Sequence, residues 1–284
     1  MYRHSLKIEE TLVKAFIYFS VVCVVFALFS ILWHILSHGV GLITWEFISS
    51  YPREMGRAGG ILPSIVGTAC LVALAVAVAG PIGILTATYL AEYAGKSRIM
   101  VAVRFSIDTL AGVPSIVFGL FGFAFLVIFC GFRWSILSGG LTLAFMILPV
   151  IVRTSEEAIK SVPYEYRECS LALGATKWQT VARVVLPAAA PGIVTGIILS
   201  IGRSVGETAA IMLTAGSSLG LPTSIMDPVR SLSLHLYILV SEGVSFEMGY
   251  ATASVLIILI FLVNLLTNMT VRYMITKRMG AGAH

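Results

Sequence analysis

Two charged residues interrupt one of the most apolar stretches of the chain. Arg203 and Glu207 lie one helical turn apart within residues 189–214. Counted from Pro191, Arg203 lies about 18 Å along a helix axis and so near the middle of a bilayer, where an arginine costs at least ~2.5–3.5 kcal/mol. A guanidinium presents a planar fork of donors that suits a tetrahedral oxyanion. We therefore predict that Arg203 meets an anion along a polar path.

Two carboxylates are candidates for the same path. Glu207 is predicted to pair with Arg203, and it can also accept the hydrogen bond of a protonated phosphate while repelling a fully ionised anion such as sulfate. Asp108 begins another apolar stretch one turn after Arg104, so these two residues are predicted to pair at the membrane edge. For both carboxylates, an ion pair with a purely structural role is the alternative.

Small residues share the helical face that carries Arg203. Gly192 and Gly196, and again Gly202 and Gly206, repeat at G-x-x-x-G spacing, which lets a second membrane helix approach closely. The opposite face consists of larger apolar residues with a helical period. We expect these four glycines to be helix-packing positions.

The composition requires a membrane around these residues. Of 284 residues, 58% are hydrophobic and 12% charged, about half the charge of a soluble domain. A closed β-barrel would need an alternating pattern that is absent, so the spans are predicted to be helices. Six apolar stretches can each cross the hydrocarbon layer. They lie at residues 15–38, 61–91, 105–131, 137–153, 189–214 and 249–271.

The distribution of positive charge predicts the orientation. With both ends of the chain in the cytosol, fourteen of the 19 Lys and Arg residues fall on inner segments, four on outer segments and one, Arg203, within the membrane. This bias follows the positive-inside rule, so the net charge of +5 reflects topology and indicates no nucleic-acid partner. The chain is thus predicted to be an all-α membrane protein with six spans and cytoplasmic N- and C-termini.

One inner segment is charged enough to need water and long enough to dock a soluble partner. Residues 154–187 mix basic and acidic side chains. We expect a helix, a turn at Gly174, and a second helix that ends at Pro187. A solvated connector without a special role is the alternative.

Other features carry less chemistry. His34 and His38 lie four apart, but no third ligand is near, and we predict no metal site. The apolar residues 231–240 are too short to span and are expected at the surface or partway into the membrane. No H-E-x-x-H motif or nucleophile elbow occurs, so no catalytic residue is assigned.

The charged inner segment carries a signature. Binding-protein-dependent ABC importer permeases have Glu-Ala-Ala, three residues, Gly, nine residues, an aliphatic residue, one residue, and Leu-Pro. The chain resembles them at Glu168, Gly174, Val184, Leu186 and Pro187, although Cys169 and Ser170 replace the two alanines. Further stretches resemble the permeases of phosphate importers, and the A-type subunit more than the C-type. These stretches are residues 80–95, 108–123, 148–163 and 202–216.

The resemblance implies an ABC type I importer permease in a prokaryotic cytoplasmic membrane. Residues 1–59 would be a tail, a first span and an external segment, residues 60–275 the transmembrane domain with a coupling loop at about 154–187, and residues 276–284 a tail. It also implies partners: a homologous second permease, two copies of a cytosolic ATPase and an external phosphate-binding protein. The residues that would couple to the ATPase are Glu168, Gly174, Ala175, Leu186 and Pro187.

The predicted function is therefore that of the permease subunit of an ATP-driven phosphate importer. The chain contains no P-loop, so we expect no cofactor in it, and ATP and Mg would be used by the partner ATPase. The alternatives are a permease for sulfate, molybdate or tungstate, the C-type phosphate permease, a membrane-embedded enzyme, and a sensor or scaffold without flux.

Overall fold

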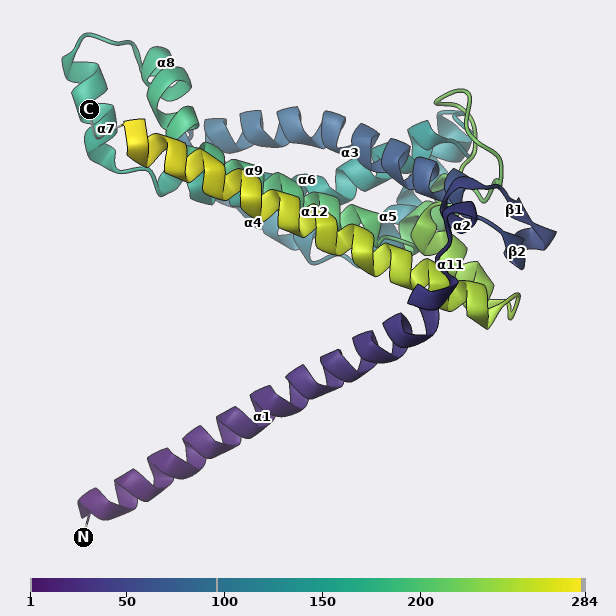
Figure 1. Ribbon diagram of the computed structural model, residues 1–284. Coiled ribbons are helices and arrows are strands. Elements are labelled where there is room, and N and C mark those ends of the chain that lie inside the picture. Colours follow the sequence, from purple (N-terminus) through teal and green to yellow (C-terminus); the bar gives the residue numbers. More distant parts are fainter. Residues whose placement is uncertain (1, 96, 282–284) are drawn as a thin grey trace.

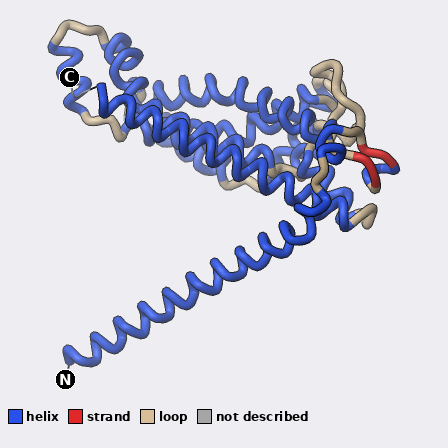
Figure 2. Tube along the Cα trace, in the orientation of Figure 1, coloured by secondary structure: helices blue, strands red, loops and turns tan. Residues whose placement is uncertain are grey.

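The computed structural model describes residues 2–95 and 97–281. Within them, five helices are long and apolar enough to cross a membrane, and a bent helix pair makes six. Strands β1 (Pro52–Arg53) and β2 (Ala58–Gly59) form one short antiparallel pair, and the rest is mostly helical (Figures 1 and 2). The prediction of an all-α membrane protein with six spans is confirmed.

The core is built on two long helices that pack closely. Helix α3 (Leu62–Thr88), which continues into the π-helical segment η3 (Tyr89–Tyr93), contacts α6 (Ile136–Lys160) along much of its length. A Cβ atom at Gly83 would lie 2.7 Å from Ile151, so only glycine allows this approach. A row of apolar side chains is buried between the helices. It includes Leu71, Ala75, Leu143, Met146 and Ile147.

The fourth span is longer than predicted. Helix α6 does not end at residue 153 but continues to Lys160, and this last part carries Arg153, Glu156 and Glu157. The charged turns remain helical because Glu156 forms ion pairs with Arg104 and Lys160. A segment that the sequence assigned to a loop therefore belongs to a rigid helix.

The fifth span begins earlier and ends sooner than predicted. Helix α8 (Lys177–Thr180), the π-helical η5 (Val181–Val185) and α9 (Leu186–Val205) form one continuous rod. The prediction that a helix ends at Pro187 is wrong. The π-helical turn shifts the hydrogen-bond pattern, and Pro187 occupies a first-turn position of α9, where no backbone N–H is needed.

After Val205 the rod breaks, and the short helix α10 (Ala209–Thr214) follows. The predicted unbroken helix over 189–214 is therefore wrong. Of the four predicted packing glycines, Gly192 lies against Ala158 and Gly196 against Thr154 of α6. Gly202 and Gly206 approach no other helix in the part of the chain that the structure describes.

This difference gives a test of the packing role. Replacing Gly196 with valine is expected to lower the free energy of unfolding by about 1–3 kcal/mol, because its side chain would meet Thr154 and α6 would have to move. Replacing Gly202 with valine changes the helix propensity equally but meets nothing within 4 Å. Thermal unfolding of both variants in detergent measures the difference. Equal losses would contradict the packing role.

The third span is also broken. Helix α4 (Arg98–Ala111) meets α5 (Ser115–Gly122), which continues as the π-helical η4 (Phe123–Phe129), at an angle of 99°. The prediction of a single helix over 105–131 is wrong. Pro114 has no N–H to continue the ladder and pushes the preceding residue out of the helical region, and the chain turns there.

The segments that follow the two breaks pack on each other. A Cβ at Gly119 of α5 would lie 2.8 Å from Ala210 of α10, and one at Gly122 would meet Thr142 and Thr214. The glycine-rich sequence after Pro114 thus serves close helix contact. As a result, both broken spans meet inside the bundle.

The end of the bundle with the two strands is closed by short elements. Besides η1 (Val40–Leu42) and η2 (Glu54–Gly56), they are α2 (Trp45–Ser49) and α11 (Leu232–Ser241). The segment at 231–240 forms a helix that is largely buried, so its expected place at the surface is wrong, while partial entry into the membrane stays a prediction. Its buried residues include Leu232, Leu234, His235 and Leu239.

Two long helices flank this body. Helix α12 (Phe246–Ala281) packs along it, whereas α1 (Tyr2–Gly39) leaves it at a wide angle (Figure 1). No residue in the most apolar window of α1 is buried. Among the described residues it touches α12 near its last turns, where His34 Nε2 lies 3.2 Å from the Tyr250 hydroxyl and Gly39 allows close approach to Tyr250 and Ser254.

Candidate functional site

Arg203 lies at mid-depth in the bundle, and its side chain has no partner in the described part of the chain. The contacts of Gly192 with Ala158 and Gly196 with Thr154 set the antiparallel register of α9 and α6. At this register Arg203 is level with Ile147, next to the midpoint of α6. Its side chain is exposed on the surface of the chain, and it has no hydrogen bond or ion pair with any residue that the structure describes. A guanidinium there must face a partner chain or water, because lipid would make it costly.

The predicted ion pair between Arg203 and Glu207 is not formed. The helix ends at Val205, so the two residues are no longer separated by a helical turn. Glu207 is instead half-buried in the break and accepts a hydrogen bond from the backbone N–H of Ala210 at 3.2 Å, which caps α10. The carbonyl of Glu207 accepts a hydrogen bond from Ser233. Side chains thus satisfy the backbone groups that the break exposes.

Asp108 belongs to a different charge cluster. It lies 3.9 Å from Arg153 of α6, which also bonds Glu157 at 2.9 Å. These three side chains are about half exposed. The predicted pairing of Asp108 with Arg104 is wrong, because Arg104 bonds Glu156 instead. The structure therefore does not bring Asp108 into contact with Arg203 or Glu207. Arg153 and Glu157, which sequence reasoning did not single out, belong to the same cluster as Asp108.

The signature segment forms a helical hairpin at one end of the bundle (Figure 1). Helix α7 (Tyr164–Ala172) ends in a turn where Gly174 has a φ of +84°, a conformation that glycine adopts most easily. Thr176 and Gln179 then form a capping box that starts α8. The predicted turn at Gly174 is confirmed.

Three of the five predicted coupling residues lie on the hairpin. Glu168 is exposed on α7, and Gly174 and Ala175 form the turn. Leu186 and Pro187 lie away from it at the start of α9, where Leu186 packs into the core. Sequence reasoning missed the most exposed apolar residue of the hairpin, Leu173, which is 89% exposed at the turn; its place next to Gly174 was the available signal.

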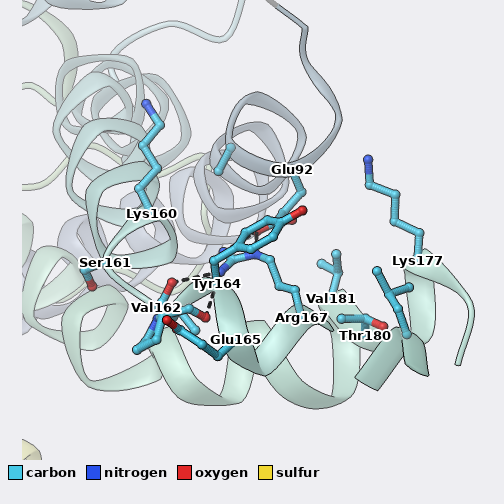
Figure 3. A pocket seen from close by; sticks show the side chains of 13 residues that line it. Glu92, Lys160, Ser161, Val162, Tyr164, Glu165, Arg167, Lys177, Thr180 and Val181 are labelled. Atoms are coloured by element: carbon cyan, nitrogen blue, oxygen red, sulfur yellow. Dashed lines mark hydrogen bonds and ion pairs between the residues drawn. The ribbon is translucent and has the colours of Figure 1, made fainter. Parts of the chain in front are cut away.

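A cavity of about 970 Å³ separates the hairpin from the ends of α3 and α6. Figure 3 shows Arg167 extending from α7 toward Glu92, with Lys160 and Lys177 on opposite sides. Arg167 Nη2 lies 2.6 Å from Glu92 Oε1, and both side chains are mostly buried. The hairpin is thus tied to the membrane helices by an ion pair that sequence reasoning missed, since the partners are far apart in the chain.

The opposite end of the bundle holds a buried cation. Arg230 donates to the hydroxyl and the carbonyl of Ser217 and contacts Nδ1 of His235 at 3.4 Å. Burial, and then the charge of Arg230, lowers the pKa of His235 to about 4, so the imidazole is neutral near pH 7. No group of three or more His, Cys, Asp or Glu side chains in the described part of the chain could hold a metal.

The architecture defines a class of protein. The permease in the alginate ABC transporter with its alginate-bound periplasmic protein superposes with a TM-score of 0.67 at 16% identity, covering 92% of this chain and 94% of that one. The inward-facing MetNI methionine ABC transporter gives 0.61 at 21% identity, over 76% and 94%. The fold is that of an ABC importer permease.

This chain belongs to the family of binding-protein-dependent transport system inner membrane components, whose sequence model matches residues 79–278. It is 36% identical over 279 residues to the phosphate transport system permease protein PstA 1 of Mycobacterium tuberculosis, covering 96% of this chain and 90% of that protein. The PstA of Mycobacterium leprae is 39% identical over 230 residues, covering 80% and 74%. The chain is therefore a multi-pass inner-membrane transport subunit rather than an enzyme, as predicted.

Proposed function

We propose that this chain forms one half of the translocation path of an ATP-driven phosphate importer. The other half would be a homologous permease, an external binding protein would deliver phosphate, and two copies of a cytosolic ATPase would supply the energy. Two relatives that are named phosphate permeases cover 96% and 80% of this chain, and they support the choice of solute. Arg203, exposed at mid-depth and without a partner among the residues that the structure describes, carries the proposal for the path.

The chemistry of phosphate fits such a group. A lone guanidinium offers several N–H donors and a positive charge to an anion that arrives without its water shell. Because the cation has no partner among the described residues, the anion need not displace an internal carboxylate. Glu207 in the neighbouring break and Asp108 beside Arg153 would line the same path at other depths.

The hairpin would dock on the ATPase in the cytosol. This orientation, with both termini inside, agrees with the excess of Lys and Arg on the inner segments. Glu168, Gly174 and Ala175 would contact the ATPase directly, whereas Leu186 and Pro187 would hold the rod that continues from the hairpin into the membrane.

Uptake of radiolabelled phosphate tests the proposal. The complete complex of this chain, the second permease, the ATPase and the binding protein would be reconstituted in proteoliposomes with ATP inside. ATP-dependent phosphate accumulation that sulfate, molybdate and tungstate do not compete away is expected. Accumulation of one of these oxyanions in place of phosphate would reject phosphate as the solute.

Glu207 is expected to set the preference for a protonated anion. Glutamine at this position still accepts the hydrogen bond from Ala210 but carries no charge. Loss of that charge removes the repulsion of sulfate, so the phosphate-to-sulfate uptake ratio should fall by roughly tenfold. The ratio is measured with both labelled anions, with Ser204→Ala, a buried neighbour, as the control. An unchanged ratio would remove Glu207 from selectivity.

A further inference from the structure

Arg167 ties three helices together. From α7 it bonds Glu92 of η3 through both Nε (3.0 Å) and Nη2 (2.6 Å). The same guanidinium donates to the carbonyls of Ile159 at 3.0 Å and Val162 at 2.8 Å, at the end of α6. One side chain therefore satisfies two carbonyls at the C-terminal end of α6 and neutralises a carboxylate in η3.

Arg104 makes a second, parallel connection. From α4 it bonds Glu156 of α6 at 2.8 Å and donates to the carbonyl of Leu90 in η3 at 2.7 Å. Each arginine thus joins the last turns of α6 to η3, one from the hairpin and one from the helix that leads to the bend at Pro114. We call these four charged residues, Arg104, Arg167, Glu92 and Glu156, the arginine clamp.

Three of the four clamp side chains are mostly buried, so their geometry is firmly held. Glu156 is 2% exposed, Glu92 9% and Arg167 13%, whereas Arg104 is 28% exposed. Loss of either Glu92 or Arg167 would leave the other as a mostly buried charge without its counter-charge, which is more damaging than the loss of a surface ion pair. By contrast, α7 itself contributes no buried residue. Its firm attachment to α3 and α6 is therefore electrostatic rather than hydrophobic.

We propose that the arginine clamp is the joint through which movement of the hairpin is passed to α3, α4 and α6. This rests on the proposed function, in which the hairpin docks on the ATPase. A polar joint at the π-helical end of α3 suits this role, since such turns interrupt the regular hydrogen-bond ladder. The clamp residues act by positioning helices and do not touch phosphate.

The test is the amount of phosphate transported per ATP hydrolysed by the reconstituted complex. In Glu92→Gln and Arg167→Gln complexes, the ATPase should remain bound and hydrolyse ATP, while transport per ATP falls roughly tenfold. The double variant should lose little more than either single variant, because both break the same joint. Arg167→Lys, which keeps the charge, should recover part of the ratio.

A matched control comes from the same helix. Glu165 is exposed on α7 and makes no ion pair with a described residue, so Glu165→Gln removes one charge without touching the clamp and should keep the wild-type ratio. A wild-type ratio of phosphate transported to ATP hydrolysed in the assembled Arg167→Gln and Glu92→Gln complexes would overturn the proposal. So would a parallel loss of transport and ATP hydrolysis that leaves the ratio constant. Failure of the proposed function can be told apart from failure of the clamp proposal, because in that case the wild-type complex itself would transport no phosphate.

Discussion

Phosphate uptake by the assembled importer is expected to fall at least about 100-fold when Arg203 is replaced with methionine. Methionine has an unbranched side chain that replaces the aliphatic part of arginine but carries no N–H donor and no charge. An anion at mid-depth would then have neither a counter-charge nor hydrogen bonds to replace its hydration shell. Initial uptake rates at saturating binding protein measure the loss, and co-purification of the ATPase verifies assembly.

Two further variants separate charge from geometry. Arg203→Lys keeps the charge but not the planar fork and should retain an intermediate rate. Leu199, one turn earlier and 56% exposed, is the matched control, and Leu199→Met should leave uptake unchanged. If Arg203→Met transported at the wild-type rate, the path through this residue would have to be abandoned.

Replacing Leu173 with glutamate is expected to release the ATPase. Leu173 is 89% exposed at the turn of the hairpin, and an apolar residue displayed in this way suits insertion into a pocket of a partner. Loss of such an anchor costs about 2–4 kcal/mol, which corresponds to a roughly 30- to 1,000-fold weaker association. Titration of the ATPase onto permeases in nanodiscs measures the change.

The control for Leu173→Glu is the same leucine-to-glutamate change at an exposed site far from the hairpin. Leu221 is 36% exposed in the loop at the opposite end of the bundle, and Leu221→Glu should leave ATPase affinity unchanged. Equal binding of the ATPase by wild type and Leu173→Glu would show that the hairpin turn is not the anchor. Because both substitutions lie at exposed sites, neither is expected to unfold the helices.

The sequence was enough to predict that six membrane spans exist, but it did not predict the breaks within the third and fifth spans. Apolar length marks a membrane helix whatever its neighbours are. Prolines are ambiguous, since Pro114 lies at a 99° bend whereas Pro81 and Pro187 lie within helices. The difference depends on π-helical turns and on neighbouring side chains that satisfy freed backbone groups. Those neighbours come from distant parts of the chain, which a local pattern does not contain.

The same distinction holds for the charged residues. The cost of a charge at membrane depth depends on one residue and the apolar stretch around it, so Arg203 could be singled out from the sequence alone. Its predicted partner, Glu207, was wrong, because this pairing requires a helix that continues through residue 207. The helix ends at Val205 instead. Arg104 likewise bonds Glu156, 52 residues away, rather than the nearby Asp108. Ion pairs between helices depend on which helices pack against each other. The spacing of residues along one helix does not contain this information.

The position of α1 has a consequence for biogenesis. The buried apolar clusters of the body contain no residue of α1, and among the described residues the helix meets α12 near Tyr250 and Ser254. Because α1 precedes α12 in the chain, the ribosome makes it well before the helix on which it docks. It therefore stays in the membrane without this contact until α12 has been inserted. The attachment of α1 to the body is thus completed late in the synthesis of the chain.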